Sequence, residues 1–191
     1  MQHKKTVLIV ATLIVLGAIT SCKNNTKQEV TTDSLPPLIE ENAQATAEVQ
    51  HNFPEKSVNI VKDTTVVINN KKYGIVTTQK TIDTSMVVYV HQTQGKVIKD
   101  VYLDFQYTLK PNAAEYTGGE KLITKHTFTK DFNEDFINNA VLYDMQFLGF
   151  NDLSKEYELK FIITKPDTDF SYVIYYFINL KGETIYEIDD L

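Results

Sequence analysis

The segment from Lys96 to Leu109, KVIKDVYLDFQYTL, constrains the fold most, because its side chains alternate in character. Val101, Leu103, Phe105, Tyr107 and Leu109 would lie on one face of an extended chain, and Tyr102, Asp104, Gln106 and Thr108 on the other. A strand has a side-chain period of two, so this pattern predicts a half-buried strand with one face on a core.

Similar segments, rich in β-branched and aromatic residues and bounded by turn residues, follow one another along the chain. They predict strands at residues 64–69, 72–82, 85–92, 122–129, 145–150, 157–164, 171–180 and 184–189. Turns are expected at Thr93–Gly95 and at Lys181–Gly182. The segment 171–180 is apolar on both faces, which favours a central position in its sheet.

One helix is expected, at residues 131–144. Asp131, followed three residues later by Glu134, resembles a capping box. Apolar residues then recur at helical spacing. They are Phe132, Phe136, Ile137, Ala140 and Val141.

These elements predict an α+β fold, in which one helix packs on an antiparallel sheet of about seven to nine strands. The alternative is a β-sandwich of two sheets, with the helix as a connection between strands.

The N-terminus has the features of a secretory signal. MQHKK is followed by an apolar run from Val7 to Ile19, which is too short to span a bilayer as a helix, since that takes about 20 residues. We therefore assign residues 1–21 to a signal peptide that is removed.

The residues at the end of this signal, Ile19-Thr20-Ser21-Cys22, resemble the bacterial lipobox. The resemblance implies cleavage between Ser21 and Cys22 and attachment of diacylglycerol to the Cys22 sulfur. Two or more acyl chains hold a protein stably on a membrane. Cys22 is the single cysteine of the sequence, so a lipidated chain would have no free thiol. The alternative is a secreted protein with one free thiol.

The sequence after Cys22 divides into two regions. Residues 22–55 are polar, contain Pro36, Pro37 and Pro54, and are expected to form a flexible tether. Residues 56–191 hold the predicted strands and are expected to form one globular domain.

Composition argues against nucleic acid as a partner. Removal of Lys4 and Lys5 with the signal leaves 17 lysines against 25 acidic residues, a net charge of about −8, and the chain has no arginine. Nucleic-acid binding relies on positive charge, and arginine makes the commonest bidentate contacts to guanine.

Two tracts carry a family resemblance: TFTKDFNEDFINNAVLYDMQF, and LKFIITKPDTDFSYVIYYFINLKGETIYEI. They are similar to the C-terminal half of an uncharacterised lipoprotein family of Bacteroidetes, annotated only by a domain of unknown function. DTTVVINNKKYGI, at the predicted start of the domain, also fits. The resemblance implies a cell-envelope lipoprotein and no particular mechanism.

No pattern of catalytic or metal-binding residues is present. His51 lies in the predicted tether, and His91 and His126 lie in separate predicted strands, without a second ligand at metal-binding spacing. Asp167 and Asp169 are expected to serve turn chemistry. We therefore expect no metal, no cofactor and no enzyme activity.

The tyrosine-rich segment SYVIYYF offers the best candidate for a binding face. Tyr172 and Tyr176, or Tyr175 with Phe177, could form an exposed row that docks a peptide or a glycan, and core packing is the alternative.

The expected function is that of a membrane-anchored, non-enzymatic envelope lipoprotein that binds a partner protein or serves an assembly. The alternative is a periplasmic module that binds a small molecule or a glycan. Some Bacteroidetes lipoproteins reach the cell surface through acidic residues soon after the cysteine. Here KNNTKQE contains only Glu29, which favours the periplasmic face of the outer membrane over the cell surface.

Overall fold

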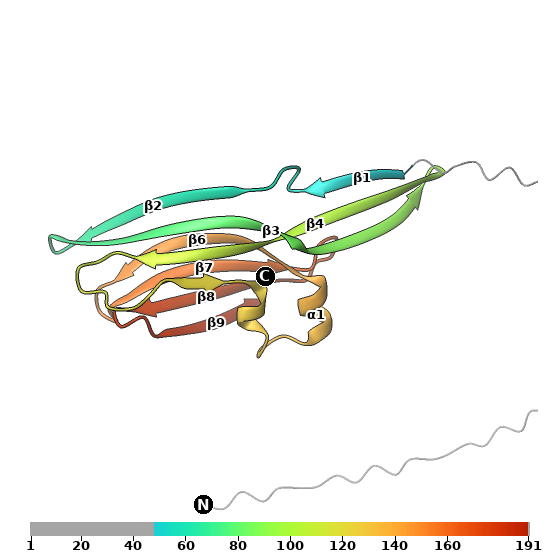
Figure 1. Ribbon diagram of the computed structural model, residues 1–191. Helices are drawn as coiled ribbons and strands as arrows, with labels where there is room; N and C mark the ends of the chain where they lie inside the picture. The colour runs from blue at the N-terminus through green and yellow to red at the C-terminus, as the bar shows by residue number, and fades with distance from the viewer. Residues whose placement is uncertain (1–47, 191) are drawn as a thin grey trace, which may run out of the picture. The chain divides into compact units, whose positions relative to one another are not determined.

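The computed structural model describes residues 48–190, which form nine strands and two short helical segments (Figure 1). The first group is β1 (Glu48–Phe53), β2 (Asn59–Ile68), β3 (Lys71–Thr93), β4 (Lys96–Pro111) and β5 (Lys121–Ile123). The 3-10 segment η1 (Lys125–Phe128) and helix α1 (Glu134–Asn139) follow. The second group is β6 (Val141–Asn151), β7 (Glu156–Thr164), β8 (Ser171–Asn179) and β9 (Thr184–Asp190).

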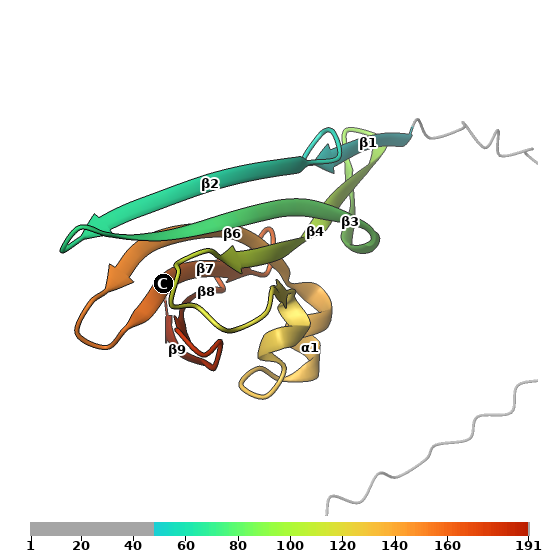
Figure 2. The same ribbon diagram turned by 60° about the vertical axis from the view of Figure 1, so that its left-hand side comes forward.

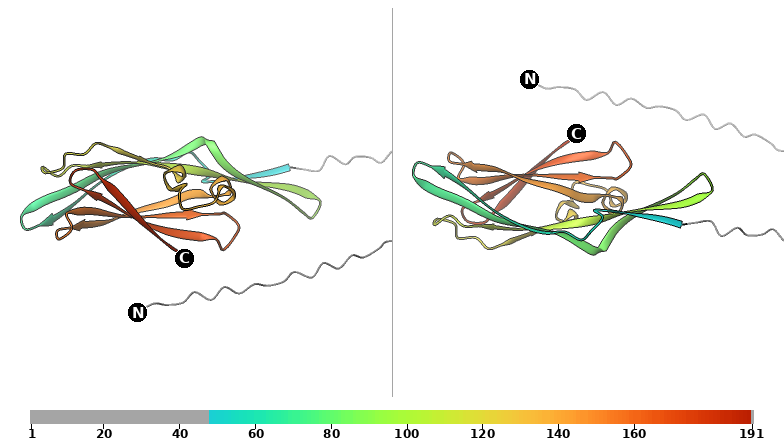
Figure 3. Two further views of the ribbon diagram at one scale, coloured as in Figure 1. Left: turned by 90° about the horizontal axis from the view of Figure 1, so that it is seen from below. Right: turned by 90° about the horizontal axis from the view of Figure 1, so that it is seen from above.

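The strands form two sheets that pack face to face (Figures 1 and 3). The first sheet has the order β1-β4-β3-β2, with β5 paired to β4, and the second is the antiparallel meander β6-β7-β8-β9. Within the first sheet, β1 runs parallel to β4, whereas the other pairs are antiparallel. The chain is therefore predominantly β, and the two-sheet alternative describes it better than one sheet covered by a helix.

The core lies between the sheets and consists of large apolar side chains from both. Tyr107 of β4 meets Phe161 of β7 edge to face, with ring centroids 5.5 Å apart. Tyr73 of β3 stacks on Phe150 of β6 at 3.7 Å. Strand β7 alternates between buried and half-buried residues along its whole length, as a strand packed on one face does.

The predicted helix at residues 131–144 is wrong at both ends. Helix α1 covers only Glu134–Asn139, and its N-cap is Asn133, whose side chain accepts a hydrogen bond from the Phe136 amide at 2.8 Å. Asp131 instead accepts a hydrogen bond from the Tyr186 hydroxyl. The helix ends at Asn139, with Ala140 as its C-cap, because the buried residues Val141 and Leu142 pair with β7, so sheet formation overrides the helical pattern.

Two further predictions are corrected in the first sheet. The segments predicted as separate strands at 72–82 and 85–92 join into the single strand β3, with a register irregularity between Ile82 and Met86. Of the segment 122–129, Leu122 and Ile123 lie in β5, and Lys125–Phe128 form η1, because Lys125 turns inward to a buried carboxylate.

The predicted tether, residues 22–55, extends too far toward the C-terminus. Residues 48–53 form β1, which pairs with β4 over Val97–Tyr102. With the neighbouring parts of β3 and β4, β1 builds an arm that extends beyond the second sheet (Figures 1 and 2). The remainder of the predicted tether, and the signal peptide at residues 1–21, lie outside the described residues. In residues 48–190, no helix is long and apolar enough to cross a membrane.

Candidate functional site

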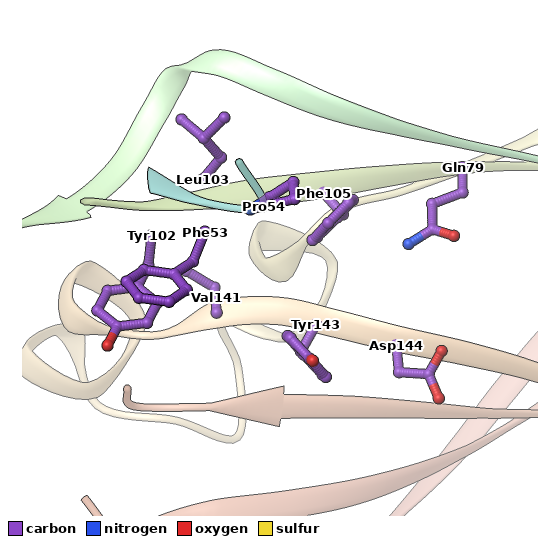
Figure 4. Close-up of a pocket in the computed structure, with 9 residues that line it drawn as sticks. All are labelled: Phe53, Pro54, Gln79, Tyr102, Leu103, Phe105, Val141, Tyr143 and Asp144. Carbon is purple, nitrogen blue, oxygen red and sulfur yellow. The ribbon is translucent and has the colours of Figure 1, made fainter. Parts of the chain in front are cut away.

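A groove of about 400 Å³ lies between β1, β4 and β6, and its lining is mostly apolar; we call it the aromatic groove (Figure 4). It is lined by Phe53, Pro54, Gln79, Tyr102, Leu103, Phe105, Val141, Tyr143 and Asp144. Ligand sites are typically concave and apolar, with a few polar groups that orient the ligand, and the aromatic groove has this composition.

An aromatic pair forms one end of the groove. The rings of Phe53 and Tyr102 stack with centroids 4.7 Å apart and planes inclined by 13° (Figure 4). The parallel pairing of β1 with β4 places these residues opposite each other. Phe53 is half exposed, so its ring offers an accessible apolar surface to a ligand.

The Tyr102 hydroxyl is held in place from the second sheet. It donates a hydrogen bond to Asp167 Oδ1 at 2.8 Å. Burial, and then this bond to a carboxylate, raise the pKa of Tyr102 to about 12. The hydroxyl therefore stays protonated at neutral pH. Asp167 adopts a left-handed backbone with φ of 56° in the loop between β7 and β8, in agreement with the predicted turn.

A bulge in β6 supplies the polar end of the groove. The pairing of β6 with β7 shifts between Leu142 and Asp144, so Tyr143 occupies an extra position and its side chain is exposed. Bulges of this kind commonly re-aim a side chain beside a site. The Tyr107 hydroxyl donates to the Tyr143 carbonyl oxygen at 3.2 Å and fixes the bulge.

Two polar side chains flank this bulge. Gln79 of β3 donates from Nε2 to the Tyr107 hydroxyl at 3.2 Å, which orients its amide. Asp144 is exposed next to Tyr143 and contributes the single charged side chain of the groove lining. A carboxylate and an amide beside aromatic rings can bind hydroxyl or amine groups, since both offer hydrogen-bond acceptors.

A buried ionic cluster holds the walls of the groove together. Asp104 Oδ1 accepts hydrogen bonds from the backbone amides of Phe105 and Leu142, at 3.0 and 2.8 Å. Its Oδ2 accepts one from Ser85 Oγ at 3.0 Å and lies 3.4 Å from Lys125 Nζ. The cluster thus joins β4, β3, β6 and η1 behind the groove.

The tyrosines predicted as a binding face do not form one exposed row. Tyr176 is only 3% exposed and packs against Phe128 and Phe161, so it belongs to the core. Tyr172 lies on the same inward face, against Phe132 and Phe136 with ring centroids 5.0 and 5.2 Å away. Tyr175 is half buried and points to the opposite face of β8, paired with Lys160 and Glu187. A ligand contact of Tyr172 or Tyr175 stays a prediction.

Two histidines that are far apart in the sequence meet in the arm. His51 Nδ1 lies 2.8 Å from Asp100 Oδ1, and His91 Nδ1 lies 3.7 Å from Asp100 Oδ2. His51 was expected in the tether, so only the pairing of β1 with β4 reveals this cluster. Within residues 48–190, no three histidine, cysteine or acidic side chains are placed to hold a metal ion.

The sequence pattern did not predict the aromatic groove, because several of its residues lie in segments to which the pattern assigned another structure. Phe53 fell in the predicted tether, and Tyr143 and Asp144 fell in the predicted helix. Proximity of a proline to an aromatic residue, as in Phe53-Pro54, is too common to mark a site. The predicted lipidation site Cys22, and the cleavage position after Ser21, lie outside the described residues.

Comparison with protein families identifies the class of the chain. A family model for a domain of unknown function, DUF4738, matches residues 39–185, and the chain belongs to this family. The match begins before β1, so it includes the strand that forms the stacked end of the groove. No curated protein matches the chain.

Proposed function

We propose that this protein is a cell-envelope lipoprotein whose β-sandwich binds a small ligand in the aromatic groove without transforming it. The observation that carries the binding role is the stacked pair of Phe53 and Tyr102, opposite the polar end formed by Tyr143 and Asp144. This geometry favours the ligand-binding alternative over a partner-protein role for this site.

The proposed membrane anchor is a lipid attached to Cys22. The apolar signal, the lipobox-like residues before Cys22 and the single cysteine support lipidation at this position. Two or more acyl chains would hold the domain at the periplasmic face of the outer membrane, and the short acid-poor sequence after Cys22 supports this side of the membrane.

The ligand best suited to the groove is a neutral or amino sugar. A sugar ring has a flat apolar face that can lie on Phe53, and hydroxyl groups that can bond to Asp144 and Gln79. An anionic sugar is disfavoured, because its carboxylate would be repelled by the carboxylate of Asp144. A volume of about 400 Å³ falls within the range of small-molecule sites.

Saturation-transfer NMR with the intact mature protein tests this function. The probes are the N-acetylglucosamine disaccharide, glucosamine and glucuronate. We expect transfer to the first two and little to glucuronate. Phe53→Ala should weaken binding about tenfold, corresponding to ~1.4 kcal/mol. Ile185→Ala, an exposed apolar residue of β9, is the matched control and should leave binding unchanged.

Asp144→Asn separates the charge from the shape of the groove. The substitution keeps the size of an exposed side chain, so the fold should be unaffected. Binding of glucuronate should then approach that of the neutral sugar. Absence of transfer to all three sugars, or equal binding by Phe53→Ala, would show that the groove does not bind sugars.

The anchor is tested separately with Cys22→Ala. The variant should lose labelling by palmitate and should leave the membrane fraction after an alkaline wash. Because the chain has one cysteine, any label on the unsubstituted protein reports this position. Continued labelling of the variant would contradict the lipobox interpretation and would leave the groove proposal to stand on its own test.

A further inference from the structure

Strand β2 forms an open edge of the first sheet. Its residues pair with β3 on one side, and no other strand of residues 48–190 pairs on the other side. In Figures 1 and 2, no described element lies beyond β2. The edge is long, since ten residues from Asn59 to Ile68 pair with β3 without a register shift. Its outward backbone N–H and C=O groups form a regular row that an added strand could pair with.

The edges of the second sheet are protected, whereas β2 is not. Strand β6 has two register irregularities, at Tyr143 and at Leu148, which interrupt any regular pairing along its outer edge. Strand β9 carries Glu187 and Asp189, whose like charges oppose pairing with a second β9. Strand β2 contains no proline and no bulge, and its two charges, Lys62 and Asp63, are of opposite sign.

The apolar residues near the two ends of β2 match each other about Thr64. Ile60 and Val61 precede the polar segment KDTT, and Val66, Val67 and Ile68 follow it. Val61 and Val67 lie on the outer face and are 64% and 63% exposed. Ile60 and Ile68 lie on the inner face, as shown by the pairing of neighbouring Val66 with buried Tyr73. Three exposed apolar side chains, Ile60, Val61 and Val67, therefore border an unpaired strand edge, where an added strand could cover them.

We propose that β2 pairs with β2 of a second copy of this chain, antiparallel about a two-fold axis at Thr64. A two-fold axis of this kind places the inner faces of both copies on the same side of the joined sheet. Because side chains alternate between the two faces along a strand, two residues can oppose each other only if their numbers differ by an even number. With the axis at Thr64, Val61 opposes Val67 of the second copy and Ile60 opposes Ile68 of the second copy. Asp63 then opposes Thr65, and Lys62 opposes Val66.

Neighbouring registers are less favourable because they bring like charges together or separate the apolar pairs. An axis at Lys62 places the two copies of Lys62 opposite each other, and an axis at Asp63 does the same for Asp63. Like charges directly opposite each other destabilise a sheet. An axis at Thr65 places Asp63 opposite Val67 and Lys62 opposite Ile68, so no two apolar side chains oppose each other. The axis at Thr64 has one such mismatch, Lys62 with Val66, but keeps the two apolar pairs. With two apolar pairs and no like charges opposed, β2 complements itself about Thr64, which favours a second copy as the partner and Thr64 as the centre.

Oxidative crosslinking of the full-length protein in membranes tests the pairing. Thr64→Cys places two thiols at the axis, where opposed Cα atoms of a strand pair are about 4.5–5.5 Å apart, within the reach of a disulfide. We expect most of the Thr64→Cys chain to form a disulfide-linked dimer under mild oxidation. The unsubstituted chain sets the background.

Leu153→Cys is the matched control, because this loop residue is 96% exposed and lies outside the strands. It should give only the background amount of dimer. Adding Val61→Lys and Val67→Lys to Thr64→Cys should reduce the dimer at least fivefold, and these exposed sites should not affect folding. Mixing Asp63→Cys with a size-tagged Thr65→Cys chain should give the mixed dimer expected for this register.

Equal dimer yields for Thr64→Cys and Leu153→Cys would overturn the proposal. Crosslinking of Thr64→Cys to a protein of another mass, without the self-dimer, would also overturn it and would indicate that β2 receives a strand from a different protein. The test does not depend on the aromatic groove, whose residues are unchanged in every variant.

Discussion

Asp104 and Lys125 form an ion pair that is almost completely buried, with 3.4 Å between Oδ2 and Nζ. Lys125 Nζ also donates a hydrogen bond to the carbonyl oxygen of Ala140 at 2.8 Å. The pair thus connects the middle of β4 to the chain entering β6. Because the same two segments carry Phe105 and Tyr143, the pair positions two walls of the aromatic groove.

Removing one partner of this pair should be strongly destabilising. Asp104→Ala would leave Lys125 buried without its counter-ion and would remove the acceptor of two backbone amides. We expect a loss of about 3–5 kcal/mol in the free energy of unfolding, measured by urea denaturation. Lys165→Ala, which removes the partly buried partner of the exposed Asp135, is the control and should cost less than about 1 kcal/mol. Equal effects of the two substitutions would show that the buried pair has no special role.

The domain should lose stability between about pH 10 and pH 12. Burial, and then the bond to Asp167, raise the pKa of Tyr102 to about 12, and the bond to Asp131, and then burial, raise the pKa of Tyr186 to about 12. An unfolded tyrosine has a pKa near 10, so in this range the unfolded chain binds fewer protons than the folded chain. Stability is therefore complete below pH 10 and decreases as the pH rises.

Urea midpoints at pH 9, 10, 11 and 12, together with tyrosinate absorbance at 295 nm, test this dependence. Tyr102→Phe removes one of the responsible groups and should reduce the slope. A midpoint that is constant or rises from pH 10 to 12 would contradict the expected sign.

Two glycines with left-handed backbones should respond differently to alanine. Gly182 has φ of 80°, and a Cβ there would lie 2.7 Å from the Cα of Gly118. Gly95 has φ of 72°, with open space around the same position. Gly95→Ala should cost about 1–2 kcal/mol from the backbone alone. Gly182→Ala should cost at least about 1 kcal/mol more, because the close approach to Gly118 must also open. Thermal unfolding of both variants gives the comparison.

The contact between His51 and Asp100 should help to hold β1 against β4. Its side chain is half exposed, so His51→Ala should change global stability by less than about 1 kcal/mol. Amide exchange within residues 48–53 should nevertheless become faster, because the contact is local. Gln50→Ala, one residue earlier on the opposite face of β1, is the control. Unchanged exchange in His51→Ala would mean that backbone pairing alone holds β1.

Local pattern predicted the strands of this protein well. The alternation in KVIKDVYLDFQYTL corresponds to β4, and Phe105, Tyr107 and Leu109 are buried as that pattern requires. The turn at Gln94-Gly95 and the two terminal hairpin strands also lie where predicted. These features depend on neighbours in the sequence, so the sequence contains their signal.

The helix and the aromatic groove were not predictable in this way. DFNEDFINNAVLYD satisfies the helical period, yet Val141 and Leu142 gain more from pairing with β7 than from continuing the helix to residue 144. Phe53 becomes part of a site only when β1 pairs with a strand from the middle of the chain. Neither the early end of the helix nor the pairing of β1 with β4 can be predicted from the periodicity of the segment concerned.

By itself, the sequence determined that the chain is rich in β-strands, where most of those strands lie and that it carries a signal-like N-terminus with a single cysteine after it. The tertiary structure decided that the strands divide into two sheets, that Tyr176 is core, and that Phe53, Tyr102 and Tyr143 share a groove. The physical reason is that periodicity reports which face of a segment is buried, whereas the choice of partner strand depends on packing between residues far apart in the chain.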